Sequence, residues 1–374
     1  MTGAAGMRSG PRIHCLLHPK ERFSASGAGA FALNIVQTVR VSRYREAITV
    51  FGIPTDKPFE GVAFQPVRMN RWHRLFGRNM GFARAYLDAV RKAPPDMIEV
   101  FNRPLIALWL ARKLRQVPVT VYIGNDPFTV KGAREAGERR RLMASLNRVY
   151  CVSEFVRGRF IEGLDAADAA RVFVIHSGMP HEGDFPAKKA KEVVFVGRVV
   201  PEKGVLEFTE ALAEVLPRHP DWSATLIGAS WFEGTSELSD FEKAVAKAAS
   251  SCDRIHAIGF RPNEEVMQHL ARAAISAVPS NCEDAFPRTA VEALSAGCAL
   301  IASRRGGLAE IGEHRARFVD AVTKDDLAAA LEDLIGDDEK REALRRRAWN
   351  DFPFTLEAVT KTWDDLRADI LRAR

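Results

Sequence analysis

Short apolar runs alternate with longer amphipathic segments along almost the whole of this 374-residue chain. In the first half, the runs that we expect to form strands are Ile13–Leu17, Ala47–Phe51, Met97–Val100, Val117–Ile123, Tyr150–Ser153 and Val172–Ile175. Helical periodicity lies between them over Phe31–Val41, Gly81–Lys92, Leu105–Arg115 and the basic stretch Lys131–Val149. Such alternation is typical of a mainly parallel sheet covered by helices, and it predicts an α/β fold.

A second series of the same kind begins after Gly178–Pro186, a segment rich in residues that break helices and strands. The strands expected there are Val193–Val196, Ser223–Ile227, Ile255–Ile258, Ala274–Val278 and Ala299–Ala302. The helices expected there are Gly204–Leu216, Ser239–Ala249, Asn263–Ala273, Thr289–Ala296, Lys324–Ile335, Asp338–Asn350 and Leu356–Arg372. We interpret Gly178–Pro186 as a linker, which predicts one domain over residues 1–182 and a second that starts at 183.

Charge is divided unevenly between the two halves. Residues 1–182 hold 28 Lys and Arg against 15 Asp and Glu, whereas the rest holds 26 against 33. A basic half attracts phosphates, anionic glycans or an anionic membrane surface. No nucleic-acid-binding motif accompanies the basic residues, so we expect no nucleic acid partner.

Neither the cysteines nor the histidines form a recognisable framework. The five cysteines are scattered, without a C-x-x-C pair, and the nine histidines show no metal-binding spacing. No apolar run reaches the roughly 20 residues that a membrane span needs, and no signal-peptide pattern is present. We therefore expect a cytoplasmic protein with reduced thiols and no bound metal or cofactor.

The first motif that indicates chemistry is Phe195-Val196-Gly197-Arg198-Val199-Val200-Pro201-Glu202-Lys203-Gly204. An expected strand ends in glycine, and an expected helix begins at the second glycine. The free amides of a helix N-terminus attract anions, and Arg198 and Lys203 can neutralise a diphosphate. The alternative is a solvated loop with two incidental cations.

The second motif, Pro279 to Leu294, again follows an expected strand and opens a helix. The backbone amides near Phe286, Pro287, Arg288 and Thr289 would face an anion or sugar hydroxyls. Asp284 and Glu292 lie eight residues apart, and carboxylates accept paired hydrogen bonds from vicinal hydroxyls. The alternative is a capping aspartate and a surface glutamate. Because both motifs follow strands of one domain, they meet where open α/β sheets bind ligands.

In this order and spacing, the two motifs resemble the retaining glycosyltransferases of family four, also called glycosyltransferase group 1. Gly259-Phe260-Arg261, Pro279-Ser280 and Gly306-Gly307-Leu308-Ala309-Glu310-Ile311 strengthen the resemblance, which is specific over residues 193–310 and weaker over 12–182. The details are closest to bacterial enzymes of lipopolysaccharide or surface polysaccharide synthesis. The resemblance implies the GT-B fold: two Rossmann-like domains facing each other across a cleft, the donor domain at 183–354, and the C-terminal helix 355–374 returning to the first, acceptor-binding domain.

The resemblance also implies roles for individual residues. Arg198 and Lys203 would hold the donor diphosphate and stabilise the leaving group, Asp284 would touch the donor sugar, and Glu292 would bind the ribose hydroxyls. Phe260, Arg261 and Pro262 would lie near the base, and Gly197 would let the backbone come close to the donor. Gly27, Ala28 and Gly29 would form the facing loop of the other domain.

Two positions depart from the family pattern. The spacing between the paired acids fits only with Asp284, not Glu283, as the first acid, and a shorter acid can alter donor-sugar preference. Where the family often has a histidine, this chain has Gly124-Asn125-Asp126. Asn125 or Asp126 would either replace part of that contact or form a structural turn, which we favour.

These observations predict a metal-independent transferase that moves a sugar from a UDP- or GDP-linked donor to a glycan or lipid-linked glycan, and the resemblance implies that it retains the anomeric configuration. No D-x-D motif follows an expected strand, so the cations would stabilise the departing diphosphate. Residues that mix cations with apolar groups suggest a peripheral membrane contact: Arg68, Arg71, Trp72, Arg74, Leu75, Phe76 and Arg78, extended by Lys131, Arg134, Arg139, Arg140 and Arg141. The alternatives are a nucleotide-sugar epimerase, or a degenerate carbohydrate-binding protein.

Overall fold

The computed structural model describes residues 10–25, 27–230 and 238–373, and these form two compact units. Unit 1 comprises the chain up to Gly178 together with Leu356–Arg374, and unit 2 comprises Met179–Thr355. The chain passes between the units twice, and the two passing segments are hydrogen-bonded to each other. The Met179 amide donates to the Phe354 carbonyl at 2.9 Å. The segment that we expected to be a free linker is therefore partly fixed by backbone pairing.

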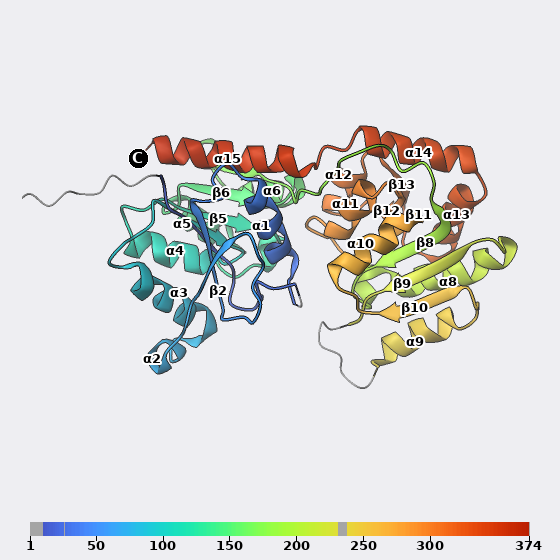
Figure 1. Ribbon diagram of the computed structural model, residues 1–374, viewed down its shortest axis with the longest axis horizontal. Helices are drawn as coiled ribbons and strands as arrows, with labels where there is room; N and C mark the ends of the chain where they lie inside the picture. Colours follow the sequence, from blue (N-terminus) through green and yellow to red (C-terminus); the bar gives the residue numbers. More distant parts are fainter. Residues whose placement is uncertain (1–9, 26, 231–237, 374) are drawn as a thin grey trace, which may run out of the picture. The chain divides into compact units, whose positions relative to one another are not determined.

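Unit 1 is built on a parallel sheet of seven strands in the order β3-β2-β1-β4-β5-β6-β7 (Figure 1). Its strands are β1 (Ile13–Leu16), β2 (Ile48–Gly52), β3 (Ala63–Pro66), β4 (Met97–Phe101), β5 (Val119–Ile123), β6 (Arg148–Cys151) and β7 (Val172–Val174). Its helices are α1 (Ala30–Val41), α2 (Arg71–Arg74), α3 (Gly77–Val90), α4 (Pro104–Lys113), α5 (Ala136–Met143), α6 (Glu154–Ile161), α7 (Ala166–Ala169) and α15 (Leu356–Arg372).

Unit 2 repeats the design with six parallel strands in the order β10-β9-β8-β11-β12-β13. Its strands are β8 (Ala190–Val196), β9 (Ser223–Ile227), β10 (Ile255–Gly259), β11 (Ala273–Val278), β12 (Ala299–Ser303) and β13 (Ala316–Val319). Its helices are α8 (Val205–Val215), α9 (Asp240–Ala249), α10 (Asn263–Arg272), α11 (Arg288–Ser295), α12 (Gly307–Gly312), α13 (Lys324–Ile335) and α14 (Asp338–Asn350). Counted within the unit, this strand order is 3-2-1-4-5-6, which is the Rossmann arrangement.

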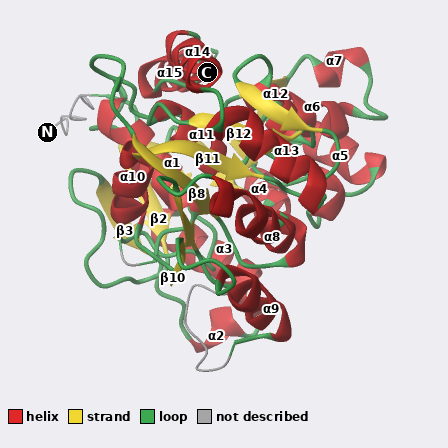
Figure 2. Ribbon diagram, turned by 90° about the vertical axis from the view of Figure 1, so that its right-hand side faces the viewer, coloured by secondary structure: helices red, strands yellow, loops and turns green. Residues whose placement is uncertain are grey.

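The core of unit 2 follows from the two-residue period of its strands. Val193 and Phe195 of β8 pack in one apolar cluster with α8, α9 and α13, whereas Val194 is equally buried but lies on the alternate face. That second face is contacted by other helices, including α10, α11 and α14. Figure 2 shows strands flanked by helices in this way. Buried on both faces, the strands have the continuous apolar runs from which they were predicted.

The stretch Lys131–Val149 does not form the long basic helix that we predicted. The helix α5 covers only Ala136–Met143, because a capping box between Glu135 and Glu138 sets its start. At the other end of the stretch, Arg148 and Val149 already belong to β6. The periodicity of this stretch therefore overstated the length of the helix.

The terminal helix α15 is attached to unit 1 by a buried ion pair. Arg367 donates from Nε and Nη2 to the two oxygens of Glu99 in β4, at 2.9 and 2.8 Å, and both side chains are at most 2% exposed. Asp364 of the same helix accepts hydrogen bonds from the Ser42 hydroxyl and the Arg43 amide. Trp363 packs on Tyr122 and Tyr150. The last segment of the chain thus completes the first unit.

We expect Arg367→Met to lower the free energy of unfolding by about 3–5 kcal/mol, because it leaves the buried Glu99 carboxylate without its cation. Urea unfolding monitored by circular dichroism measures the loss. The control is Arg372→Met, in the same helix, whose side chain is 74% exposed. Its ion pair with Asp369 is worth about 1 kcal/mol at most. Equal losses in the two variants would contradict this assignment.

Candidate functional site

The two motifs of unit 2 meet at the point where the order of the strands reverses. The loop after β8 carries Arg198 and Lys203, and the loop after β11 carries Asp284. The strands β8 and β11 are paired neighbours in the centre of the sheet. In open α/β sheets this switch point, at the carboxyl ends of the strands, is where ligands bind.

Lys203 and Asp284 form the central contact of this site. The Lys203 ammonium lies 2.7 Å from both Asp284 oxygens, and the Ser280 hydroxyl donates to Asp284 Oδ2 at 2.5 Å. The Lys203 and Asp284 side chains are 19% and 18% exposed. Sequence reasoning selected both charges but gave them separate tasks, and it missed Ser280. An ammonium has three N–H groups, so two can engage the carboxylate while one is left for a ligand.

The backbone brings the two loops together at Gly204. This residue has φ of +62°, and a Cβ atom there would lie 2.1 Å from the Pro279 carbonyl oxygen. The Asn281 amide donates to the Glu202 carbonyl at 2.9 Å, which joins the loops a second time. The helix α8 begins one residue after Gly204, preceded by the 3-10 turn Pro201–Lys203. A side chain at residue 204 would therefore separate Lys203 from Asp284.

A second polar group surrounds Glu292, near the start of α11. This carboxylate is 2% exposed, and its Oε1 accepts from Arg288 Nε at 2.8 Å and from Asn263 Nδ2 at 2.9 Å. Asn263 is the first residue of α10, after Pro262 at the N-cap, and its side chain bonds Glu292. Glu292 is thus a fixed buried acid and not the surface glutamate of the alternative interpretation.

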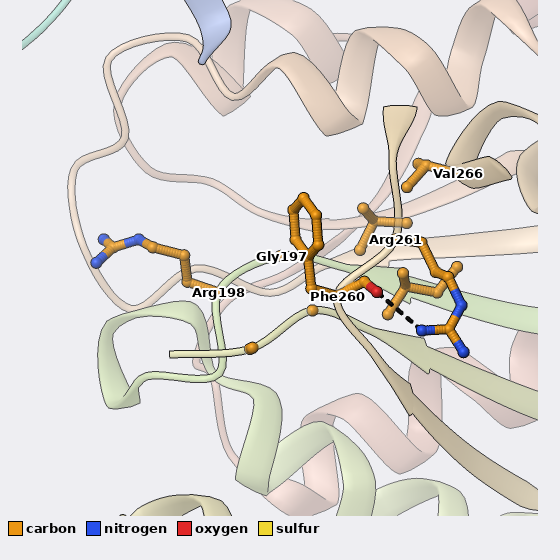
Figure 3. A pocket seen from close by; sticks show the side chains of 9 residues that line it. Gly197, Arg198, Phe260, Arg261 and Val266 are labelled. Carbon is orange, nitrogen blue, oxygen red and sulfur yellow. Dashed lines mark hydrogen bonds between the residues drawn. The ribbon is translucent and has the colours of Figure 1, made fainter. Parts of the chain in front are cut away.

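A cavity of about 230 Å³ opens at the ends of β8, β9 and β10. Five of its lining residues are labelled in Figure 3: Gly197, Arg198, Phe260, Arg261 and Val266. Arg198 extends away from Phe260, and Arg261 donates to the Phe260 carbonyl at 2.8 Å (Figure 3). Phe260 is 46% exposed, which is unusual for so large an apolar ring. The cavity thus combines an apolar wall with an exposed cation at its edge.

The remaining predicted residues of unit 2 lie in the segment that leads into α11. Phe286 is 8% exposed, and its ring contacts that of Phe354. Pro287 precedes the helix without a side-chain cap, and Arg288 and Thr289 begin it. Burial of the ring leaves the backbone of this segment, and not the Phe286 side chain, as the part that can meet a ligand.

The glycine pair 306–307 supports the Asp284 loop from behind. The Gly307 amide donates to the Asp284 carbonyl at 2.7 Å, and the Gly306 amide donates to Glu283 Oε2 at 2.7 Å. A Cβ atom on Gly307 would lie 2.2 Å from the Ala285 carbonyl oxygen. Glu283 therefore anchors the loop while Asp284 faces Lys203, in agreement with the choice of Asp284 as the first acid.

Gly27 and Gly29 lie in unit 1, in the loop between β1 and α1. A Cβ atom on Gly29 would lie 2.6 Å from Glu21 Oε1, which also accepts from the Ala32 amide at 2.8 Å. Glu21 is 6% exposed and lies 3.1 Å from His18 Nε2. Sequence reasoning missed Glu21, whose carboxylate accepts from the Ala32 amide in the first turn of α1.

The segment 124–126 forms a structural turn. Asp126 caps the 3-10 turn Pro127–Thr129 and is paired with Arg159. Asn125 accepts from the Asn102 amide group at 2.8 Å. A Cβ atom on Gly124 would lie 2.4 Å from the Phe31 ring, so a histidine would need that ring to move. The Phe31 ring thus fills the space beside Gly124.

Cys282 lies in the loop that carries Asp284. Burial, followed by the charge of Asp284, raises the pKa of the Cys282 thiol, so this cysteine is not a thiolate at neutral pH. Within the described ranges, no three His, Cys, Asp or Glu side chains gather as metal ligands would. The groups that the two loops of unit 2 bring together are cations, carboxylates and backbone amides.

Known proteins match this geometry. Residues 181–351 match the family described as glycosyl transferases group 1. The matched region lies within unit 2. Spore coat protein SA of Bacillus subtilis is 24% identical over 358 residues, 87% of this chain and 91% of that protein. The lipopolysaccharide 1,2-N-acetylglucosaminetransferase of Salmonella typhimurium is 26% identical over 193 residues, 48% of this chain and 50% of that protein.

Solved structures agree on the fold. Anabaena HepE, solved in complex with UDP-glucose, has a TM-score of 0.75 at 16% identity, over 96% of this chain and 100% of that one. Sucrose-phosphate synthase from Thermosynechococcus elongatus has a TM-score of 0.73 at 17% identity, over 97% and 100%. The two Rossmann-like units therefore have the GT-B fold, as predicted.

We expect Gly307→Ala to destabilise unit 2 by about 1–3 kcal/mol, because the new methyl group meets backbone that must shift. Thermal unfolding measures the loss. The control is Gly158→Ala in α6, where no atom lies within 4 Å of the new carbon. That variant should gain about 0.5–1 kcal/mol from helix propensity. A Gly307→Ala protein as stable as wild type would refute the close approach of Gly307 to the loop that carries Asp284.

Proposed function

We propose that this protein transfers a sugar from a nucleotide-diphosphate donor to a glycan or lipid-linked glycan, with retention of anomeric configuration. The observation that carries the proposal is the Lys203–Asp284 pair at the strand-order switch point of unit 2. It joins a cation suited to a phosphate with an acid suited to sugar hydroxyls. The family match over residues 181–351 supports the same chemistry.

In this proposal, each part of the donor is bound by named residues. The third N–H of Lys203 and the exposed guanidinium of Arg198 bind the donor diphosphate. Among the described residues, Arg198 has no ion-pair partner, so its charge is available. Asp284 accepts hydrogen bonds from the donor sugar, and Glu292 accepts them from the ribose hydroxyls.

The base lies in the cavity beside Phe260 and Arg261, with Gly197 at its floor. Phe286, Arg288 and Thr289 contribute backbone N–H groups to the donor, whereas Pro287 has none. Unit 1 binds the acceptor, since most of the positive charge lies in its sequence.

The reaction breaks one bond to the anomeric carbon and forms another on the same face. The bond from C1 to the diphosphate oxygen breaks, the acceptor oxygen bonds to C1, and the acceptor proton passes to the departing phosphate. Negative charge develops on that phosphate, where Lys203 and Arg198 stabilise it most. In this scheme neither a metal nor a cofactor is required.

The acceptor is proposed to be a lipopolysaccharide or surface polysaccharide intermediate, handled on the cytoplasmic face of a membrane. The Salmonella relative, named as a lipopolysaccharide N-acetylglucosaminetransferase, supports this class of acceptor. None of the helices in the described part of the chain has the length and apolar content to cross a bilayer. Any membrane contact we propose is therefore peripheral.

We expect Lys203→Met and Arg198→Met each to lower kcat about 10²–10³-fold, because each removes one charge from the departing diphosphate. Transfer from labelled UDP- and GDP-sugars to a glycan extract measures this, with EDTA present throughout. Lys191→Met is the matched control, since its exposed side chain pairs with Asp221 at the other end of β8.

Three results would contradict this assignment. Activity that returns only with added Mg²⁺ would assign the phosphate charge to a metal. An epimerised donor formed without acceptor would make the protein an epimerase, and donor binding without turnover on any extract would make it a binding protein.

We expect Glu292→Gln to weaken nucleoside-diphosphate binding about tenfold, because the neutral amide loses charge-assisted bonds to the ribose. Calorimetry compares UDP and GDP with their 2′,3′-dideoxy forms on both proteins. The loss should vanish for the dideoxy nucleotides, which have no hydroxyls for residue 292 to bind. An equal loss for both forms would assign Glu292 a role in folding alone.

A further inference from the structure

One surface of unit 1 exposes large apolar side chains that the proposed site does not use. We call it the α2 tip, residues 68–78, which lies beside α3 (Figure 1). Trp72 is 75% exposed, Leu75 is 74% exposed and Phe76 is 51% exposed. Three such residues within five positions form an apolar patch that a soluble surface rarely carries without a partner.

The same surface is strongly and uniformly basic. Between Glu60 and Asp88 the sequence has no acidic residue and five arginines. Four of them, Arg68, Arg71, Arg74 and Arg78, are exposed and belong to the α2 tip. The patch therefore combines apolar side chains with a positive field, and its partner must be both negatively charged and able to take up apolar groups.

The apolar groups are exposed although the backbone of the tip is firmly held. The Asn70 side chain caps α2 through the His73 amide at 2.9 Å, and His73 Nδ1 accepts from the Asn70 amide at 3.2 Å. His73 Nε2 lies 2.9 Å from Asp88 of α3. A Cβ atom on Gly81 would lie 2.4 Å from the His73 carbonyl oxygen, so α3 approaches α2 closely. His73 thus anchors α2 to α3 while Trp72 and Leu75 stay in solvent.

We propose that the α2 tip docks on an anionic phospholipid bilayer. Trp72, Leu75 and Phe76 enter the boundary between headgroups and acyl chains, and the four arginines contact lipid phosphates. Tryptophan suits that boundary because its ring is amphipathic, and arginine places its charge at headgroup level while its stem covers apolar surface. Surfaces that combine basic and apolar side chains bind membranes both by electrostatic attraction to anionic lipids and by burial of apolar area.

The second basic segment that we connected with the membrane, Lys131 to Arg141, lacks a comparable apolar surface. Arg139 of α5 is 3% exposed and donates to the backbone carbonyls of Ala133, Arg134 and Glu162, so its placement on a basic surface is wrong. The exposed large side chain nearest to it in sequence, Phe128, lies under the guanidinium groups of Arg139 and Arg159. This segment therefore has one exposed large apolar side chain nearby against three on the α2 tip, where Phe76 likewise lies under a guanidinium group, that of Arg84.

The docking deepens the proposed function, on which it rests for the lipid-linked acceptor, but it can be tested without turnover. The full chain is sedimented with vesicles of phosphatidylglycerol and phosphatidylcholine in equal parts, and with vesicles of phosphatidylcholine alone. We expect binding to the first and much weaker binding to the second. Arg71→Gln/Arg74→Gln/Arg78→Gln should weaken binding on the order of 100-fold, since each cation near an anionic surface contributes about a factor of five.

Two matched variants separate this surface from a general effect of charge. Lys131→Gln/Arg140→Gln/Arg141→Gln removes three exposed cations from the α5 region and should retain most of the binding. Trp72→Ser/Leu75→Ser/Phe76→Ser keeps every charge but should lose about tenfold or more in affinity. Tryptophan emission should shift to the blue on binding in the wild type and shift less in Trp72→Phe.

Several outcomes would overturn the proposal. Among them are equal binding to neutral vesicles, loss in the α5 variant in place of the tip variant, and unchanged binding of the serine variant. If the serine variant alters the oligomeric state without vesicles, the surface is an interface between copies of this chain. If a tip variant loses vesicle binding but still transfers sugar fully to a soluble glycan acceptor, the proposed function stands. If the wild type binds vesicles but transfers no sugar, the proposed function is refuted and the docking is not.

Discussion

The ion pair between Lys203 and Asp284 is the constraint on which the proposed site depends. It joins loops from two adjacent strands whose crossover connections run in opposite directions across the sheet. Much of the surrounding sequence serves this contact. Gly204 lets the loops approach, Ser280 orients the carboxylate, and the Gly306–Gly307 pair supports the backbone of the acid. A diphosphate arriving at Lys203 would share its ammonium with Asp284, which ties the phosphate and the sugar to one pair of side chains.

A second ion pair, in this case fully buried, plays the corresponding part in unit 1. Glu99 lies in the middle of β4, where a lone carboxylate would be costly, and Arg367 from the end of the chain neutralises it. The helix α15 therefore does more than cover an apolar face. Because its arginine is needed by the central sheet, unit 1 is complete only after the whole of unit 2 has been synthesised, and the two chain passages at Met179 and Thr355 are a consequence.

The sequence predicted helices and strands correctly where burial produces a periodic apolar pattern. It did not predict contacts between residues that are distant in the sequence. Helices α13, α14 and α15 begin and end where their periodicity predicted, and β9 does likewise. The edge strand β3 was missed, since its residues are mostly exposed and carry no apolar run. Among the site residues, Arg198, Lys203, Asp284 and Glu292 were chosen from local motifs. Ser280, Asn263 and Glu21 were not assigned those contacts, because each acts through a partner that lies four to 29 residues away in the sequence and is brought near only by the fold.

The basic residues of the first half predict a partner only after the structure has separated those that are exposed from those that stabilise the fold. Several arginines there hold the fold together: Arg139 and Arg171 donate to backbone carbonyls of neighbouring loops, and Arg159 pairs with Asp126. These charges raise the net count without offering a binding surface. The α2 tip differs in that its arginines are exposed around apolar side chains which the unit itself leaves uncovered. Net charge thus predicts only a class of ligand, while exposure decides which of the basic residues can meet it.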